Sequence, residues 1–256
     1  LESGSPAAAH TAGARLLMAH GEWALAARHL ELAVARDPDD GDVHAYLGHT
    51  LDHMGYRDEA LAHLQDAIEL ASDPVAAHTF LGLHYDRWGH IAAARSAYEA
   101  AYDQDPQSAA LCLEIGQTWA AERRYVAAEI WLREATSLQP NDPAVWEALA
   151  SFYLDYHISA ERRAVEAADR LVALLPDDPD AHDLLGWAAV QIGDDQLAER
   201  HLQRALELDP FLASAYYHIG VLRTQQGRAP EAERAFVRAM DLDTRGTLRT
   251  LIERAR

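Results

Sequence analysis

Residues 180–210 read DAHDLLGWAAVQIGDDQLAERHLQRALELDP, and the spacing of their apolar side chains predicts two helices joined by a tight turn. Leu184 and Ala188 belong to a helical stripe that Gly193 interrupts, because glycine readily adopts the left-handed conformation that ends a helix. Pro210 then disfavours continuation of the second helix. The stretch is therefore one helical hairpin, and its apolar face needs a neighbouring copy in order to be buried.

Copies of this hairpin recur at a spacing of 34 residues, with one step of 36. A small residue recurs in each first helix, where it allows the two helices to approach closely: Ala14, Gly48, Gly82, Gly116, Ala150, Gly186 and Gly220. Glycine also recurs at the turn, except that Arg123 and His157 replace it in two copies, so we expect those two turns to differ in conformation. The two extra residues are expected around His157, Ile158 and Ser159, lengthening that turn.

The third copy carries the fullest set of recurring residues, namely Leu81, Gly82, Tyr85, Gly89, Ala94, Tyr98, Ala101 and Pro106. This pattern resembles the tetratricopeptide repeat. The resemblance implies an all-α fold, a right-handed superhelical α-solenoid of stacked helical hairpins. The expected repeats are residues 7–40, 41–74, 75–108, 109–142, 143–178, 179–212 and 213–246, preceded by a linker or cloning remnant at 1–6 and followed by a C-terminal capping helix at 247–256.

Composition argues against several classes of function. The formal net charge of -19 disfavours binding to nucleic acid or to anionic lipid. Lysine is absent, so the chain has no phosphate-loop lysine and no lysine for a pyridoxal Schiff base. Cys112 is the only cysteine and is expected to be a buried structural thiol. We therefore expect neither an enzyme nor a cofactor.

The sequence also bears on location. No apolar run approaches the roughly 18 residues that span a bilayer, and the first residues lack the features of a signal peptide. We expect a cytoplasmic protein without membrane insertion. The arginine-rich, lysine-free composition suggests a GC-rich bacterial genome.

The resemblance implies a concave groove lined by the first helices, which would hold a peptide or protein segment. The groove residues that it implies are His49, Asp52, His53, Thr79, Leu83, Asp86, Arg87, Leu113, Gln117, Glu147, Ser151, Asp155, Asp183, Trp187, Val190, Gln191, Tyr217, Val221 and Gln225. Acidic and aromatic side chains dominate this set, and they favour a partner with basic and apolar residues. Alternatively, Leu83, Leu113 and Val221 pack between repeats instead.

Two further functions stay open. Residues 1–212 hold 36 acidic residues and 14 arginines, a net charge of -22, whereas residues 213–256 hold 5 and 8, a net charge of +3. The arginine-rich end could therefore dock on the acidic body of another copy and build a homo-oligomer through Arg223, Arg228, Arg234, Arg238, Arg245 and Arg249. The chain could equally be a regulatory or substrate-recruiting arm of a larger enzyme.

Histidines raise the question of a metal site. His49 and His53 share one helical face near Asp52 and Asp86, but they lack the glutamate of the HExxH motif, and two imidazoles alone make a weak site. Four other histidines recur where the family often has tryptophan, and these are expected to pack structurally: His10, His44, His78 and His182. We therefore expect no metal site.

Overall fold

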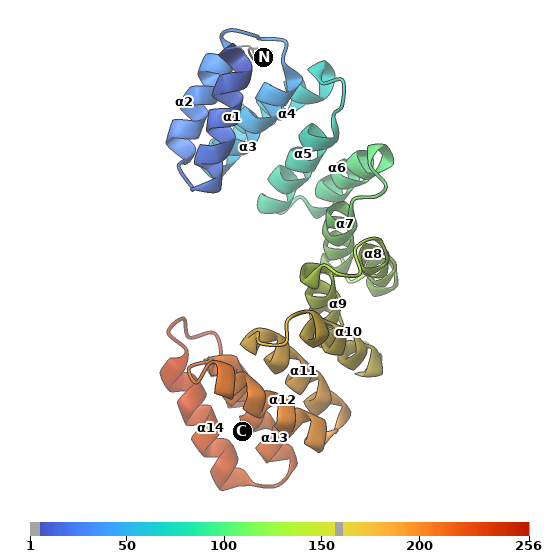
Figure 1. Cartoon of the computed structure of the whole chain (residues 1–256), viewed down its shortest axis with the longest axis vertical. Coiled ribbons are helices and arrows are strands. Elements are labelled where there is room, and N and C mark those ends of the chain that lie inside the picture. Colours follow the sequence, from blue (N-terminus) through green and yellow to red (C-terminus); the bar gives the residue numbers. More distant parts are fainter. Residues whose placement is uncertain (1–5, 157–160, 256) are drawn as a thin grey trace. The chain divides into compact units, whose positions relative to one another are not determined.

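The computed structural model describes residues 6–156 and 161–255, which form fifteen α-helices and no strand (Figure 1). The chain divides into two compact units, and the division falls within α8, after Trp131. The first unit holds α1 (Pro6–Ala19), α2 (Trp23–Val34), α3 (Gly41–His53), α4 (Arg57–Leu70), α5 (Val75–Arg87), α6 (Ile91–Gln104), α7 (Ala109–Ala121) and the start of α8 (Tyr125–Leu138). The second holds the rest of α8, then α9 (Pro143–Asp155), α10 (Glu161–Leu174), α11 (Pro179–Ile192), α12 (Asp195–Leu208), α13 (Ala213–Gln225), α14 (Ala229–Leu242) and α15 (Arg249–Ala255). Among these helices, none is long and apolar enough to cross a membrane.

Small residues bring the helices of a hairpin together, as the sequence predicts. Gly82 of α5 lies against the ring of Tyr98 on α6, and a Cβ atom added to this glycine would come within 2.4 Å of that ring. Gly220 of α13 lies against Phe236 of α14 in the same way, also at 2.4 Å. Both rings are fully buried. The glycine and the aromatic ring therefore form one packing unit, and a larger side chain in place of the glycine would displace the ring.

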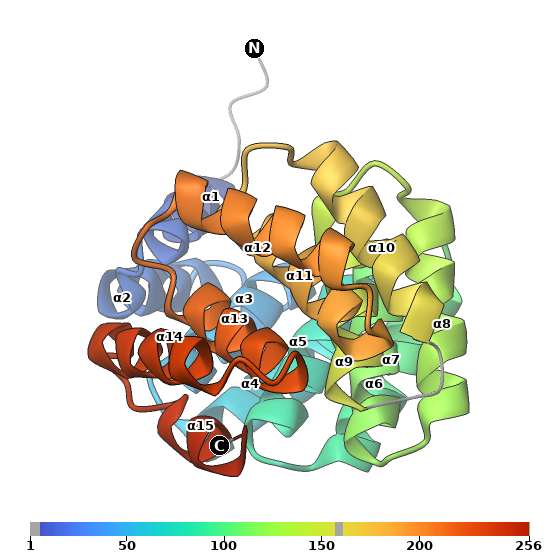
Figure 2. The same ribbon diagram turned by 90° about the horizontal axis from the view of Figure 1, so that it is seen from below.

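Within each unit, hairpins bury apolar side chains against the helix that follows them. In the first unit, Tyr98 of α6 packs with Leu111 and Ile115 of α7. In the second unit, Phe236 of α14 packs with Ile252 of α15, which is fully buried. Figure 2 shows α15 beside the last hairpin, α13 and α14. This contact covers apolar side chains of α14.

The turn at Arg123 corrects a prediction from the sequence. Arg123 has a φ of 59°, in the left-handed region that the turn glycines also occupy, for example Gly89 at 76°. Its N–H donates to Ala120 O (2.8 Å), as the N–H of Gly89 donates to Asp86 O (2.9 Å). The expectation of a different turn is therefore wrong here, because closing the hairpin demands this conformation whichever residue occupies it. The second such turn, at His157, and the two extra residues expected around it lie outside the described residues.

Replacing Arg123 by glycine should stabilise the protein. A residue other than glycine in the left-handed region costs roughly 1–2 kcal/mol, part of which the greater freedom of glycine in the unfolded chain offsets. We expect Arg123→Gly to raise the free energy of unfolding by about 1 kcal/mol, measured by urea denaturation. The control is Glu122→Gly, since Glu122 has an ordinary φ of -82° and should lose stability. If both variants lost stability, Arg123 would not be strained.

Candidate peptide-binding grooves

The predicted groove residues lie on the first helices of the hairpins. In the first unit these helices are α3, α5 and α7, and in the second they are α9, α11 and α13. Within each unit neighbouring first helices pack on one another, α3 on α5, and α11 on both α9 and α13. Equivalent positions of successive repeats therefore lie side by side.

Asp52 is the centre of a buried polar cluster in the first unit, and only 2% of this residue is exposed. Its Oδ1 accepts hydrogen bonds from His84 Nδ1 (2.7 Å) and from Trp88 Nε1 (3.0 Å). Its Oδ2 accepts from Arg87 Nε at 2.7 Å. We name these four residues the Asp52 cluster. The cluster joins α3 to α5, so two predicted groove residues, Asp52 and Arg87, are already paired with each other.

Two predicted groove histidines belong to an aromatic stack. His53 stacks on Trp23 with ring centroids 3.9 Å apart, and its Nε2 accepts from Arg87 Nη2 at 3.2 Å. His49 stacks on Phe80 at 4.3 Å. Burial and the neighbouring His53 lower the pKa of His49 to about 4, although Asp52 opposes the shift. His49 is therefore a neutral packing element near pH 7.

The other predicted residues of the first unit are split between packing and surface. Leu83 packs against the buried cluster that contains Tyr98 and Ile115, in agreement with the packing alternative. Thr79 donates its hydroxyl to a carbonyl of its own helix (2.7 Å). Leu113 is half-buried, whereas Asp86 and Gln117 are exposed.

The second unit brings predicted residues together in a pocket of about 330 Å³. Its polar lining comes from α9, α11, α13 and the segment before α11: Glu147, Ser151, Asp178, Asp180, Asp183 and His218. Three leucines, Leu171, Leu175 and Leu184, supply its apolar lining. We name this cavity the acidic pocket. Sequence reasoning placed Glu147, Ser151 and Asp183 on the groove side, and the structure shows that they share one cavity.

Negative charge is concentrated in the acidic pocket. Burial raises the pKa of Asp180, and the nearby carboxylates of Asp178, Asp183 and Asp209 raise it further. Asp183 itself is 6% exposed and accepts a hydrogen bond from His218 Nδ1 at 2.7 Å. The pocket therefore has the electrostatic character of a site for a cation.

Aromatic rings adjoin the acidic pocket. Trp187 stacks on His218, with ring centroids 4.4 Å apart and an angle of 15° between the planes. Tyr217 lies next to Trp187, at a centroid distance of 6.1 Å. Both are half-buried, and burial raises the pKa of Tyr217. We name Trp187, Tyr217 and His218 the aromatic wall.

The remaining predicted residues of the second unit differ in exposure. Val190 is 1% exposed and packs beside Leu202, so it offers no surface to a partner. The prediction that Val190 belongs to the groove surface is therefore wrong, because its side chain packs in the core of the second unit. Val221 is half-buried against the same core, and Gln191 is half-buried. Asp155 and Gln225 are exposed.

The sequence pattern did not show which side chains hydrogen-bond to the predicted groove residues Asp52 and Asp183. His218 lies 35 positions after Asp183, and Arg87 lies 35 after Asp52. Because first helices of successive repeats lie side by side, complementary polar residues about one repeat apart indicate a contact. This spacing could have identified His218 from the sequence.

Two of the arginines considered for self-assembly form ion pairs within the second unit. Arg223 pairs with Glu199 and also donates to Gln226 Oε1 (2.6 Å). Arg228 donates through Nε to Glu231 Oε1 at 2.9 Å. These contacts compete with any docking of the two arginines on another copy.

Solved structures of proteins with the same helical hairpins match between 67% and 98% of the chain. The crystal structure of MamA matches 67% of this chain and 93% of its own at 22% identity, with a TM-score of 0.56. YrrB, a TPR protein with an unusual peptide-binding site, matches 75% and 97% at 18% identity (TM-score 0.57). A tetratricopeptide repeat protein from Parabacteroides merdae matches 98% of both chains at 14% identity (TM-score 0.66). At identities as low as these, the similarity shows a shared fold and nothing more specific.

The sequence itself matches family models. No curated protein sequence matches the chain. Two models described as tetratricopeptide repeat match it, one over residues 17–82 and 89–152 and the other over residues 162–213 and 185–245. Together these segments span most of the chain. The chain belongs to the tetratricopeptide repeat family.

Proposed function

We propose that this protein is a non-catalytic interaction scaffold whose second unit binds a peptide or protein segment with basic and apolar side chains. In this proposal an arginine enters the acidic pocket and an apolar residue lies on the aromatic wall. Tetratricopeptide repeat proteins are generally interaction scaffolds without catalytic activity. YrrB, which shares the fold, has a peptide-binding site, and this supports a peptide as the class of ligand.

The lining of the acidic pocket is the observation that carries the proposal. Its leucines suit the methylene stem of an arginine, while Glu147, Asp180 and Ser151 offer oxygen atoms to the guanidinium group. The raised pKa of Asp180 reflects burial together with repulsion among carboxylates. A bound cation would relieve that repulsion, so the free energy stored there favours binding.

The aromatic wall suits the rest of such a segment. Trp187 and Tyr217 are half-buried, so one part of each side chain is held by packing while another part remains accessible. The stacking of Trp187 on His218 fixes the orientation of its ring before a ligand arrives. Rigid aromatic rings of this kind contribute strongly to peptide affinity, through apolar contact and through attraction of a cation to the ring face.

Binding of labelled peptides tests the proposal. The probes are two fluorescein-labelled nonapeptides of the same leucine content, one with arginine and the other with glutamate at the remaining positions. We expect fluorescence anisotropy to show binding of the arginine peptide only, and binding should weaken as salt concentration rises. The double variant Glu147→Gln with Asp180→Asn should weaken it about tenfold or more, because it removes two charges from the pocket.

The matched control is Asp177→Asn. Asp177 precedes the pocket residue Asp178 but does not line the pocket, and its side chain is 82% exposed. It tests whether general charge, rather than the pocket, attracts the peptide. Equal weakening by the control and by the pocket variant would reject the pocket as the binding site. Binding that survived the double variant Trp187→Ala with Tyr217→Ala, in protein with unchanged helical circular dichroism, would reject the aromatic wall.

A further inference from the structure

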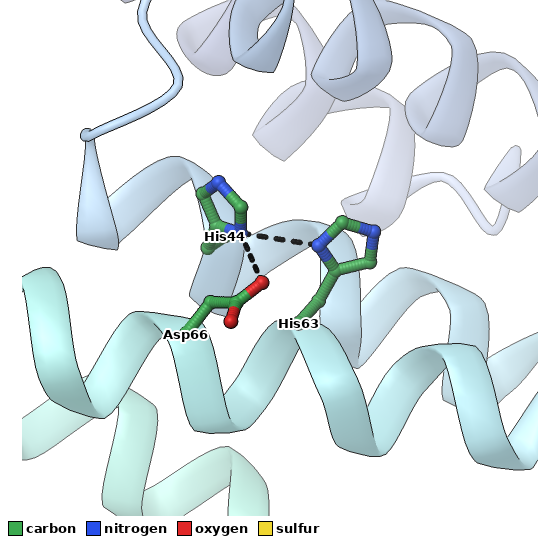
Figure 3. A group of neighbouring side chains, drawn as sticks. All are labelled: His44, His63 and Asp66. Atoms are coloured by element: carbon green, nitrogen blue, oxygen red, sulfur yellow. Dashed lines mark hydrogen bonds and ion pairs between the residues drawn. The ribbon is translucent and has the colours of Figure 1, made fainter.

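A group of three possible metal ligands lies in the second hairpin and includes none of the predicted groove residues. Figure 3 shows His44 of α3 facing His63 and Asp66 of α4. The two Nδ1 atoms are 3.1 Å apart, and His44 Nδ1 is 3.5 Å from Asp66 Oδ2. A tetrahedral zinc ion bound at about 2.0–2.1 Å separates its ligand atoms by roughly 3.3 Å. The observed distances lie on either side of that value, so little movement is needed to hold an ion.

The orientation of His44 supports a metal ligand at Nδ1. Its Nε2 lies 3.1 Å from the carbonyl oxygen of Pro38, an acceptor, so Nε2 carries the proton. In the neutral ring Nδ1 then presents a lone pair to His63 and to the carboxylate of Asp66. His63 can donate its own Nδ1–H to this lone pair, but the carboxylate remains opposite an acceptor. A cation at this point would satisfy all three groups, and a backbone carbonyl on the far nitrogen is the usual support of a metal-binding histidine.

Glu31 of α2 acts electrostatically on His63, so it adds a second negative charge near the group. This charge further favours a cation.

Two other hairpins contain the histidine pair without the carboxylate. The Nδ1 atoms are 3.2 Å apart in the pair of His10 and His29, and 2.9 Å apart in the pair of His182 and His201. His182 also directs Nε2 to a proline carbonyl, at 3.0 Å. The positions that correspond to Asp66, however, are occupied by Leu32 and Arg204. The histidine pair alone is thus a recurring packing contact. Of these three pairs, only His44 with His63 has an acidic residue that completes a set of three ligands.

We infer that His44, His63 and Asp66 form a binding site for one divalent transition-metal ion of the zinc type, held between α3 and α4. Two imidazoles and one carboxylate are ligands that zinc and cobalt share, whereas magnesium prefers oxygen ligands alone. Three protein ligands leave a fourth position for water. The site ties together the two helices of one hairpin, so a bound ion should stabilise the folded state.

Zinc titration of the full chain, stripped of metal with a chelator, tests the inference. We expect isothermal titration calorimetry to show saturable zinc binding and no binding of magnesium. The variant His63→Ala should lower the zinc affinity about 50-fold or more, and Asp66→Asn should lower it about tenfold. Cobalt should give the visible absorption of a low-coordinate site, and that absorption should disappear in His63→Ala.

His201→Ala is the matched control, because it breaks an equivalent histidine pair that has no acidic neighbour at the Asp66 position. Its zinc affinity and stoichiometry should equal those of the unchanged protein. Asp66 is exposed, so Asp66→Asn keeps the test valid even if His63→Ala fails to fold. The inference is overturned if metal-free protein binds no zinc, if Asp66→Asn binds zinc as tightly as the unchanged protein, or if His201→Ala weakens binding as much as His63→Ala does.

Discussion

Replacing Asp52 by alanine is expected to lower the free energy of unfolding by about 3 kcal/mol. The substitution removes the acceptor of the Asp52 cluster and leaves the ring N–H of His84, which is 1% exposed, without a partner. Arg87 contributes less to the loss, because its side chain is 41% exposed and can turn to solvent. Chemical denaturation followed by circular dichroism measures the change.

The control for this prediction is Asp86→Ala. Asp86 is an exposed acid on the neighbouring first helix, so its removal should change the free energy of unfolding by less than about 0.5 kcal/mol. A double-mutant cycle between Asp52→Ala and His84→Ala should show strong coupling, since the two residues share one buried hydrogen bond. If Asp52→Ala were no more damaging than Asp86→Ala, the cluster would not stabilise the contact between α3 and α5.

Acid is expected to destabilise the protein through His49. The pKa of His49 is about 4 in the folded protein, against an ordinary value of 6.5, mainly because the ring is buried. Between these two values the unfolded chain binds the proton and the folded protein does not. The contribution of His49 is therefore complete above about pH 6.5 and is lost as the pH falls toward 4, amounting to about 3 kcal/mol.

The variant His49→Phe isolates this effect. Phenylalanine keeps a ring against Phe80 and Trp23 but cannot be protonated. We expect the loss of stability between pH 7 and pH 4, measured by urea denaturation, to be smaller in the variant by about 3 kcal/mol. Contributions of opposite sign from Glu114 and Asp180, whose pKa values are raised, are the same in both proteins and cancel. Parallel pH profiles for the two proteins would contradict the assignment to His49.

The repeat and its helices follow from the sequence because they depend on local features. The apolar period, the small residue of the first helix and the proline after the second each act within one hairpin or on its neighbour. Gly82 illustrates this, since its recurrence predicts the close contact that Tyr98 makes with it. Arg123 is the exception. The sequence suggested a different turn there, but closing the hairpin requires the left-handed conformation, and Arg123 adopts it.

The candidate sites depend on which side chains the tertiary structure brings together. Resemblance placed Asp52, Asp183 and Val190 on the groove side, but it did not indicate that Asp52 is neutralised by Arg87 or that Val190 is buried. Packing of successive first helices decides these points, because residues about one repeat apart become neighbours there. The acidic pocket likewise exists only once α9, α11 and α13 are packed.

The hairpin of residues 180–210 is fully specified by its own sequence, because its turn, apolar stripes and terminating proline act over a few residues. What it contributes to binding is decided by its neighbours in space. Trp187 becomes part of an aromatic wall only because His218 of the next first helix lies flat against it. His182 and His44 occupy equivalent places, yet only His44 meets a carboxylate from its second helix. Local interactions determine the fold of each repeat, whereas the chemistry of each surface depends on contacts between elements far apart in the chain.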